Sequence, residues 1–480
     1  MTQLLQWRPR TGGTVIWIAV GCALLGAQLM VLWISGSFAY GIDPRYAPIW
    51  QLVALMVVSG IVFLTLLRAV PNTGTGRGLV LWVVGLGLVM RAVMLPSTPI
   101  LEDDFYRYLW DGAVTSHGIN PYAHAPSAAA TPPGLGMLAA QSGDIVERVN
   151  YQGLRTIYPP VAQAAFAAAH WLAPWSLTGW RVMVIVFELA ALGLLFALLR
   201  DMNRSPLWSA LYWWNPLAIV QLTNAGHMDA IILPFVLGAI WLGSRGRVFL
   251  ASGSLALAVG VKVWPVLLLP LLLGPIRSNR KKLITAATVF FILTGLLAVP
   301  VLLAGLDQTS GFLAYGRHWQ VNDALFTVIA WLVANAATPL VAADFDTSFL
   351  ARLLIGAGLL GTSLWLARGR VVDAETLSSH AMIVVAALFL LSPAQYPWYY
   401  VWLLPLLALT PRLSLLSLTA LLPLYYLRFY FEARGEPGRF DHGVVWIEHL
   451  PVLALLVWEW LRAKRQSIDV SKTGGYGVAR

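Results

Sequence analysis

The stretch LEDDFYRYLWDGAVTSHGINPY, from Leu101 to Tyr122, is the part of the chain around which the rest is organised. It places three consecutive acids, Glu102, Asp103 and Asp104, directly after an apolar segment, in a sequence of which only 11% is charged. Soluble proteins carry roughly 25% charged residues. Because charge is scarce in this chain, three adjacent carboxylates at this position indicate a functional site.

Composition indicates a polytopic membrane protein. Of the 480 residues, 58% are hydrophobic and 12% aromatic, which is far more apolar than a soluble chain. The net charge of +10 does not indicate nucleic acid as a partner, because Lys and Arg stand singly or in small clusters between apolar segments. The single cysteine, Cys22, excludes an intramolecular disulfide. It lies in Val15–Ile34, which is too long for the core of a secretory signal and is expected to stay as an anchor.

The positions of Lys and Arg predict the orientation of the spans. Basic residues before the first apolar segment and after the last one put both termini in the cytoplasm, with about 14 spans between them. The cluster Glu102–Asp104 then lies outside. The apolar run between SRGR and IRSNRKK has basic residues at both ends, so it must cross an even number of times. This predicts two short helices that turn at VKVWP, with Lys262 at or near the outer end.

We expect one catalytic membrane module with additions at both ends. The predicted parts are an N-terminal transmembrane hairpin in residues 1–78, the module in residues 79–410 with long outer loops at 96–178 and 305–347, C-terminal transmembrane helices in 411–465, and a cytoplasmic tail in 466–480. Each outer loop holds an apolar segment shorter than the roughly 20 residues that a span needs. One follows YPP at residues 158–160 and the other is Ala324–Ala337. Both are predicted to be interfacial helices.

The acids begin a pattern with helical spacing. If the stretch is helical, Asp104, Arg107, Tyr108 and Asp111 share one face, since they lie at i, i+3, i+4 and i+7. Two explanations of the acids stay open. Asp103 or Asp104 could cap the helix, where its negative charge interacts favourably with the positive end of the helix dipole. Alternatively, a carboxylate beside apolar bulk keeps a raised basicity and can act as a general base on a hydroxyl.

Further motifs follow in order along the chain. The acids begin a D-x-Y-x-Y type pattern, GINPY and YPP come behind it, and NAGHMDA (224–230), GVKVWPVLLLP (260–270) and SPAQYPWYYVWLLP (392–405) come later. Together these motifs resemble the GT-C superfamily of lipid-phosphate-sugar-dependent glycosyltransferases, and most closely its bacterial polyprenyl-phosphate-mannose mannosyltransferases. The resemblance runs from about Leu79 to Leu409. It departs from the family's H-N-D-A element at Met228, which stands in place of Asn.

The resemblance implies an all-α polytopic fold, a GT-C-like bundle of about 14 transmembrane helices with outer interfacial helices and loops. It implies transfer of a sugar, mannose by resemblance alone, from a polyprenyl-phosphate donor to a lipid or glycan acceptor, with inversion. Asp104, by its place before Phe105 and Tyr106, matches the family's general base better than Asp103. The protein is expected in the inner or plasma membrane with its active site outside. No cofactor is required; the two carboxylates could hold a divalent metal, but none is predicted.

The leaving phosphate calls for cations or hydrogen-bond donors. The candidates for binding donor phosphate or substrate are Lys262, His227, Asp229, Arg107, Tyr108, Arg317, His318, Tyr158, Tyr396, Trp398 and Tyr399. Structural alternatives remain for most of them. Lys262 could snorkel to the interface, His227 with Asp229 could cap a helix, and Arg317 with His318 could be solvated loop residues. The aromatic residues at 396–400 could form an interfacial belt, and Tyr158 could chiefly set the angle at which the following helix begins.

Four other polar residues are interpreted as structural. Glu188 lies midway along a span, where a buried interhelical hydrogen bond is the favoured explanation. The same interpretation is given to Arg91, Arg428 and His449.

Two other functions remain open. A transporter or flippase of lipid-linked sugars would show inverted halves and interrupted spans with ionisable residues near the midplane, whereas this chain keeps most polar groups in outer loops. An outer-face ligase that transfers a whole glycan would share the predicted topology. The chain has neither a P-loop nor a Rossmann glycine fingerprint after a strand, so a nucleotide-sugar site is not indicated.

Overall fold

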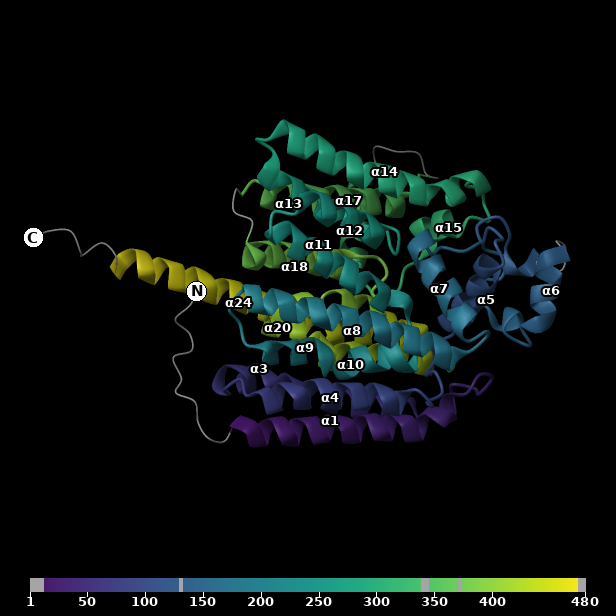
Figure 1. Ribbon diagram of the computed structural model, residues 1–480. Helices are drawn as coiled ribbons and strands as arrows, with labels where there is room; N and C mark the ends of the chain where they lie inside the picture. Colours follow the sequence, from purple (N-terminus) through teal and green to yellow (C-terminus); the bar gives the residue numbers. More distant parts are fainter. Residues whose placement is uncertain (1–12, 129–132, 338–344, 370–372, 474–480) are drawn as a thin grey trace, which may run out of the picture.

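The computed structural model describes residues 13–128, 133–337, 345–369 and 373–473, and all regular elements within these ranges are helices (Figure 1). The prediction of an all-helical polytopic membrane protein is confirmed. The N-terminal arm with its two arginines, part of the small-residue stretch 125–136, and residues 474–480 of the expected tail lie outside the described residues.

Within the described ranges, nine segments are long and apolar enough to cross a membrane. Eight of them are built on one main helix each: α1 (Gly13–Ser35), α2 (Ile49–Leu64), α4 (Arg77–Met94), α8 (Leu177–Asp201), α14 (Arg280–Ala304), α17 (Thr347–Leu366), α18 (Ala374–Leu391) and α24 (Val445–Thr473). The ninth, Leu413–Glu432, is a run of short helices that ends with α22 (Leu427–Glu432). The 25 residues of α8 would extend about 37 Å at 1.5 Å per residue, which exceeds the roughly 30 Å of a bilayer core. Ser176 caps this helix by accepting a hydrogen bond from the backbone N–H of Gly179.

A tenth crossing exists if a strongly bent pair of segments counts as one span. Pro216–Asn224 and Met228–Ser244 meet at 107°, and every residue from Ser209 to Leu233 is buried. Irregular backbone at membrane depth is tolerated where protein surrounds it. The bend therefore brings the loop between the two segments, including His227, into the interior of the bundle.

The predicted number of about 14 spans includes several pieces that the structure divides into short helices. The predicted hairpin of two short helices around VKVWP is present, as α12 (Val248–Val259) followed by Trp264–Ile276. Each part is shorter than a full span, although each is included in the predicted number of spans. The span expected near residue 405 contains α19 (Leu404–Leu409). Pro265, Pro270 and Pro405 each lie in the first turn of one of these short pieces, a position that proline tolerates and before which it does not continue the helical ladder. Sequence hydropathy counts such pieces as spans because it does not detect the breaks.

The interpretation of Glu188 and Arg91 as structural is confirmed. Arg91 Nη2 lies 2.6 Å from Glu188 Oε1, and both side chains are fully buried between α4 and α8. Arg91 Nη1 also donates to the carbonyl oxygens of Gly87 and Trp213. The two charges therefore compensate each other in the apolar interior.

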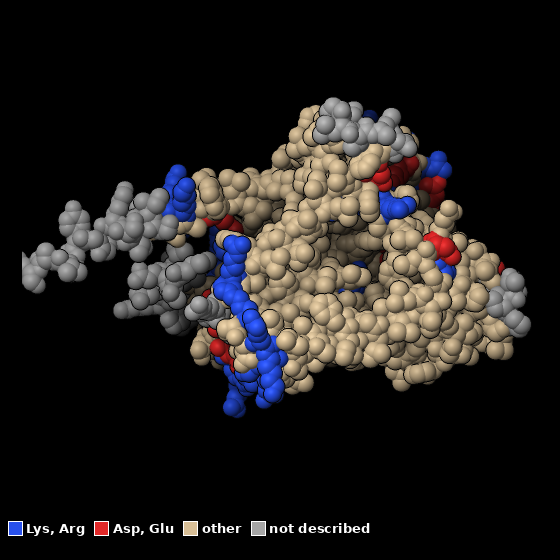
Figure 2. Space-filling view, turned by 90° about the horizontal axis from the view of Figure 1, so that it is seen from above, with Lys and Arg blue, Asp and Glu red and all other residues tan. Residues whose placement is uncertain are grey.

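The two ends of the bundle differ in character. Helices α5 (Asp104–Ser116), α6 (Pro133–Gln141), α7 (Pro160–Leu172) and α15 (Gly311–His318) gather at one end, and α24 projects from the other (Figure 1). Many of the Lys and Arg side chains visible in Figure 2 lie at the end from which α24 projects, around an otherwise apolar surface. The helix α16 (Leu325–Ala337), like α7, is shorter than a full span.

Candidate active site

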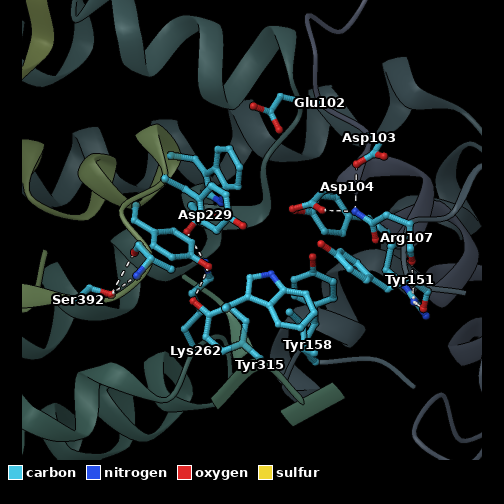
Figure 3. Close-up of a pocket in the computed structure, with 18 of the residues that line it drawn as sticks. Glu102, Asp103, Asp104, Arg107, Tyr151, Tyr158, Asp229, Lys262, Tyr315 and Ser392 are labelled. Carbon is cyan, nitrogen blue, oxygen red and sulfur yellow. Dashed lines mark hydrogen bonds and ion pairs between the residues drawn. The ribbon is translucent and has the colours of Figure 1, made fainter. Parts of the chain in front are cut away.

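A cavity of about 650 Å³ opens at the end of the bundle formed by α5, α7 and α15. Figure 2 shows a hollow in the apolar face, and Figure 3 shows the acidic, basic and aromatic side chains that line the cavity. The lining comes from segments far apart in the sequence: the start of α5, the loop before α7, the turn after α12, α15 and the region around Tyr396–Trp402. Such a concave site with a few convergent polar groups is typical of a ligand-binding site.

Asp104 is the first residue of α5, and its carboxylate lines the cavity. Asn150 Nδ2 donates to Asp104 Oδ1 at 2.8 Å and to Asp103 Oδ1 at 3.0 Å. Tyr108, one turn further along α5, donates from its hydroxyl to Asp104 Oδ2 at 3.4 Å. The predicted helical face is therefore present and supplies one of the partners of Asp104.

Helix capping does not explain the acid cluster. Asp103 occupies the N-cap position of α5, yet its carboxylate accepts no hydrogen bond from the helix backbone. Two residues earlier, Leu101 lines the cavity with a φ of 56°, a region that costs a non-glycine residue roughly 1–2 kcal/mol. The backbone thus adopts a strained turn beside the cavity, immediately before the acids.

Burial raises the pKa of all three acids, but their surroundings differ. The pKa of Asp103 is raised to about 6, first by burial and then by the negative charge of Asp104. The pKa of Asp104 is also raised by burial, but Asn150, Lys262 and Tyr108 each act to lower it. The pKa of Glu102 is raised by burial and by both neighbouring carboxylates. Asp104 is therefore the member of the cluster whose ionised form its neighbours stabilise most directly.

Lys262 lies in the turn after α12 and does not snorkel. Its Nζ donates to Asp229 Oδ1 at 2.7 Å, and Trp402 Nε1 donates to the same oxygen at 2.6 Å. The ammonium also lies 4.1 Å from the ring centroid of Tyr399, an arrangement that favours a cation. Burial lowers the pKa of Lys262, and the charge of Asp229 opposes that shift.

His227 is fully buried in the bend before Met228–Ser244. Its ring stacks on Trp398 with a centroid distance of 4.0 Å. Its Nε2 lies 3.7 Å from Glu102 Oε2 and its Nδ1 lies 3.8 Å from Asp104 Oδ2. The side chain makes no cap hydrogen bond to the following helical turn, so the alternative that His227 caps a helix is wrong.

Four aromatic residues, Tyr396, Trp398, Tyr399 and Trp402, face the cavity rather than forming a belt on the surface. Tyr396 stacks on Trp398 at 4.3 Å and Tyr399 stacks on Trp402 at 4.5 Å between ring centroids. The hydroxyl of Tyr399 lies 2.8 Å from that of Tyr315 on α15. All five line the cavity, where aromatic faces can pack against a sugar ring or an isoprenoid chain.

Tyr158 and Arg107 also line the cavity. Tyr158 packs edge-on against Tyr108 at 5.1 Å between centroids. Arg107 Nη2 donates at 3.1 Å to three backbone carbonyls, those of Asn150, Tyr151 and Leu154. Arg107 therefore fixes the loop that carries Asn150, the residue that binds both aspartates.

Three predicted residues do not line the cavity: His227, which is fully buried, and Arg317 and His318. Arg317 and His318, at the end of α15, are exposed, and the Arg317 guanidinium lies 5.9 Å from the ring centroid of Phe349. Phe312 and Tyr315 of the same helix do line the cavity. The loop-solvation alternative describes Arg317 and His318 better than a role in phosphate binding.

Sequence reasoning also missed residues of this site. The cavity lining includes Glu102, Asn150, Tyr315, Trp402 and Arg428. Arg428 was expected to be purely structural; its Nε does donate to Glu432 Oε1 at 2.6 Å, yet the side chain lies on the cavity wall. Glu102 belongs to the acid cluster that the sequence singles out, but it is not among the catalytic or binding candidates named from the sequence. No sequence pattern marks Asn150.

Within the described ranges, no group of three or more His, Cys, Asp or Glu side chains is arranged to hold a metal ion. The polar and aromatic groups that line the cavity are the acids, Lys262 and the rings of Tyr396, Trp398, Tyr399 and Trp402.

The geometry can be compared with known proteins. A family model described as "Alpha-(1->6)-mannopyranosyltransferase, N-terminal domain" matches residues 12–277, which include the acid cluster, His227, Asp229 and Lys262. The chain belongs to this mannosyltransferase family. It is 24% identical to alpha-(1->6)-mannopyranosyltransferase A of Mycobacterium tuberculosis, over 91% of this chain and 89% of the relative. It is 23% identical to the protein of that name from Corynebacterium glutamicum, over 78% of this chain and 80% of the relative.

Membership of this family confirms the resemblance to GT-C mannosyltransferases and supports a role in mannosyl transfer. The protein is thus a membrane glycosyltransferase with multiple apolar helices. The family match and the cavity coincide in the region from Leu101 to Trp264. The cavity is therefore the natural candidate for the active site of this mannosyltransferase.

Proposed function

We propose that the protein transfers mannose from a polyprenyl-phosphate mannose to a lipid or glycan acceptor, on the extracytoplasmic face of the plasma membrane. The observation that carries this proposal is the cavity itself, in which the carboxylate of Asp104 and the ammonium of Lys262 lie on different walls (Figure 3). The carboxylate of Asp104 can activate a hydroxyl by accepting its proton, and the ammonium of Lys262 can compensate the negative charge of a phosphate. The family match supports mannose as the transferred sugar, and the positions of Asp104 and Lys262 in the cavity support the roles proposed for them.

The form of the cavity favours a lipid-linked donor. Besides its polar groups, the lining includes Leu388 and Phe389 of α18 and Phe429 of α22, which belong to membrane-spanning segments. Val263, beside Lys262, also lines the cavity and is 58% exposed. A sugar phosphate that emerges from a bilayer on an isoprenoid tail needs a polar chamber continuous with apolar helices, and this cavity has both parts.

The reaction we propose is a single displacement. Asp104 accepts the proton of the acceptor hydroxyl while the hydroxyl oxygen forms a bond to the anomeric carbon of mannose. The bond between that carbon and the phosphate oxygen breaks, and the polyprenyl phosphate leaves with the electron pair. Lys262 compensates the charge that develops on the phosphate. This mechanism inverts the anomeric carbon.

The relatives are named for the α-(1→6) linkage, and we propose the same linkage for this chain. Formation of an α product with inversion requires a donor in which mannose is β-linked to the phosphate. The acceptor hydroxyl would then be the primary hydroxyl at carbon 6 of a mannoside. These two requirements make the stereochemistry of the proposal testable.

A transporter of lipid-linked sugars is the second function to test, because the bent pair Pro216–Asn224 and Met228–Ser244 is an interrupted span beside buried charges. The assay uses purified protein in liposomes with radiolabelled polyprenyl-phosphate mannose and an α-mannoside acceptor. The transferase proposal predicts a labelled product that α-mannosidase degrades. Movement of the donor between leaflets without any product would favour the transporter. Asp43→Asn, a change in a surface pair with Arg45, serves as a control expected to behave as the parent.

A further inference from the structure

Glu102 is a second carboxylate at the cavity that the proposed reaction does not use. Its side chain is 7% exposed and lines the cavity. Its Oε1 has no hydrogen-bond partner among the described residues. A buried carboxylate oxygen without a hydrogen bond is costly, so the presence of this side chain beside the reacting groups calls for a role.

His227 lies between Glu102 and Asp104. Its two ring nitrogens face one carboxylate each, at 3.7 Å and 3.8 Å, and neither nitrogen has a hydrogen-bond partner among the described residues. The stack on Trp398 is nearly parallel, at 13° between planes, and holds the ring in this orientation. An imidazole can accept a proton at one nitrogen and release one from the other.

We propose that His227 connects Asp104 to Glu102 and carries the proton of the acceptor hydroxyl away from Asp104 after each transfer. This inference rests on the proposed function. At the start, Nε2 of His227 carries a hydrogen and faces Glu102, and Nδ1 carries none and faces Asp104. Both distances exceed a normal hydrogen bond by less than 1 Å, so a small rotation or shift closes each contact.

The proton balance of this relay is complete. The acceptor hydroxyl gives its proton to Asp104 as the new glycosidic bond forms. Protonated Asp104 gives a proton to Nδ1 of His227, and the imidazole gives its Nε2 proton to the carboxylate of Glu102. Asp104 is then ionised again, and the imidazole holds its hydrogen on Nδ1. The ring returns to its starting form when Nδ1 releases that proton to solvent or to the departing phosphate and Nε2 takes back the proton held by Glu102. One proton therefore leaves the site in each turnover.

The charged groups around His227 suit this role. Besides Glu102 and Asp104, the nearby charge that acts on it is Lys262, and Asp229 binds Lys262 at 2.7 Å. The charges of Asp103 and Arg428 act on Glu102 from further away. The imidazole therefore has an anion at each end and a compensated cation nearby, which leaves the two carboxylates as its only direct charged neighbours in the described structure.

The test compares His227→Gln, Glu102→Gln and the double variant in the mannose-transfer assay, with His124→Gln, an exposed outer-loop residue, as the matched control. The relay predicts that each single variant lowers kcat by about 10- to 100-fold with KM for the donor within about twofold. It predicts that the double variant is no slower than the slower single variant, because both act in one path.

A second readout separates the relay from a packing role for His227. In His227→Gln, kcat should rise with the concentration of a small buffer base at constant pH and ionic strength, because the base takes over proton removal, and the parent should show no such rise. Multiplicative losses, absence of buffer rescue, or normal kcat in Glu102→Gln would overturn the relay. Glu102→Gln decides the matter alone if His227→Gln does not fold. A parent that transfers no mannose would instead refute the proposed function.

Discussion

The side-chain amide of Asn150 lies 2.8 Å from Oδ1 of Asp104, although 46 residues separate them in the chain. This hydrogen bond stabilises the ionised carboxylate and so acts to lower its pKa, against the rise that burial causes. Arg107 holds the backbone on which Asn150 sits. The readiness of Asp104 to accept a proton is therefore controlled by a residue from a distant loop.

Replacing Asn150 by Leu should move the acid limb of the activity profile to higher pH. Loss of the amide raises the pKa of Asp104 further, so a larger fraction is protonated at neutral pH and kcat/KM falls. Raising the pH should restore part of the loss. The measurement is kcat/KM across about pH 5 to 9. Asn335→Leu, an exposed position on α16, is the control; an unchanged acid limb in Asn150→Leu would refute the electrostatic role.

Lys262→Met should lower kcat by about 100-fold, since the phosphate loses its cation as the bond to mannose breaks. Asp229→Asn keeps the cation but loosens it, so a smaller loss is expected. Steady-state kinetics with the lipid donor measure both effects. Equal, mild losses in the two variants would mean that the pair at 2.7 Å holds the fold together and does not bind phosphate.

Arg91→Met should destabilise the protein by about 3–5 kcal/mol, because it leaves Glu188 buried without its partner. The double variant Arg91→Met with Glu188→Leu should recover much of that loss, since neither charge then remains. Thermal unfolding in detergent, followed by tryptophan fluorescence, compares the three proteins. A double variant as unstable as the single one would contradict the structural interpretation of the pair.

Sidedness can be tested with single cysteines. In a Cys22→Ser background, which removes the chain's one cysteine, a cysteine introduced at the exposed Gln308 beside α15 should react with a membrane-impermeant maleimide in intact cells. A cysteine at the exposed Ser278, before α14, should react only after permeabilisation. The reverse pattern would place the cavity on the cytoplasmic side.

The sequence predicts most of the site because its signals are local. The helical spacing from Asp104 to Tyr108, and the scarcity of charge that singles out Lys262 and Asp229, can be read without knowing the fold. The sequence also predicts that Glu188, midway along a span, has a buried hydrogen-bonding partner, because a buried Glu needs one. Its partner, Arg91, is 97 residues away and is named only by the packing of α4 against α8.

The remainder depends on long-range packing. Asn150 binds Asp104 because Arg107 fixes its loop, and His227 meets Glu102 because the chain bends by 107° between two short helices. Arg317 and His318 follow Tyr315 within a few residues, yet both are exposed and neither lines the cavity. Periodicity and hydropathy carry no information on such contacts. Hydropathy likewise does not detect where an apolar run divides into short helices, so the sequence counts these pieces as full spans.

The most direct test of the account is the transfer of labelled mannose from polyprenyl-phosphate mannose by the parent, Asp104→Asn and Asp103→Asn, each reconstituted and shown to unfold at the same temperature. If Asp104 is the general base, its Asn variant should lose about 10²- to 10⁴-fold in kcat, and Asp103→Asn should lose less than about tenfold. A folded Asp104→Asn variant with kcat close to that of the parent would contradict the central claim.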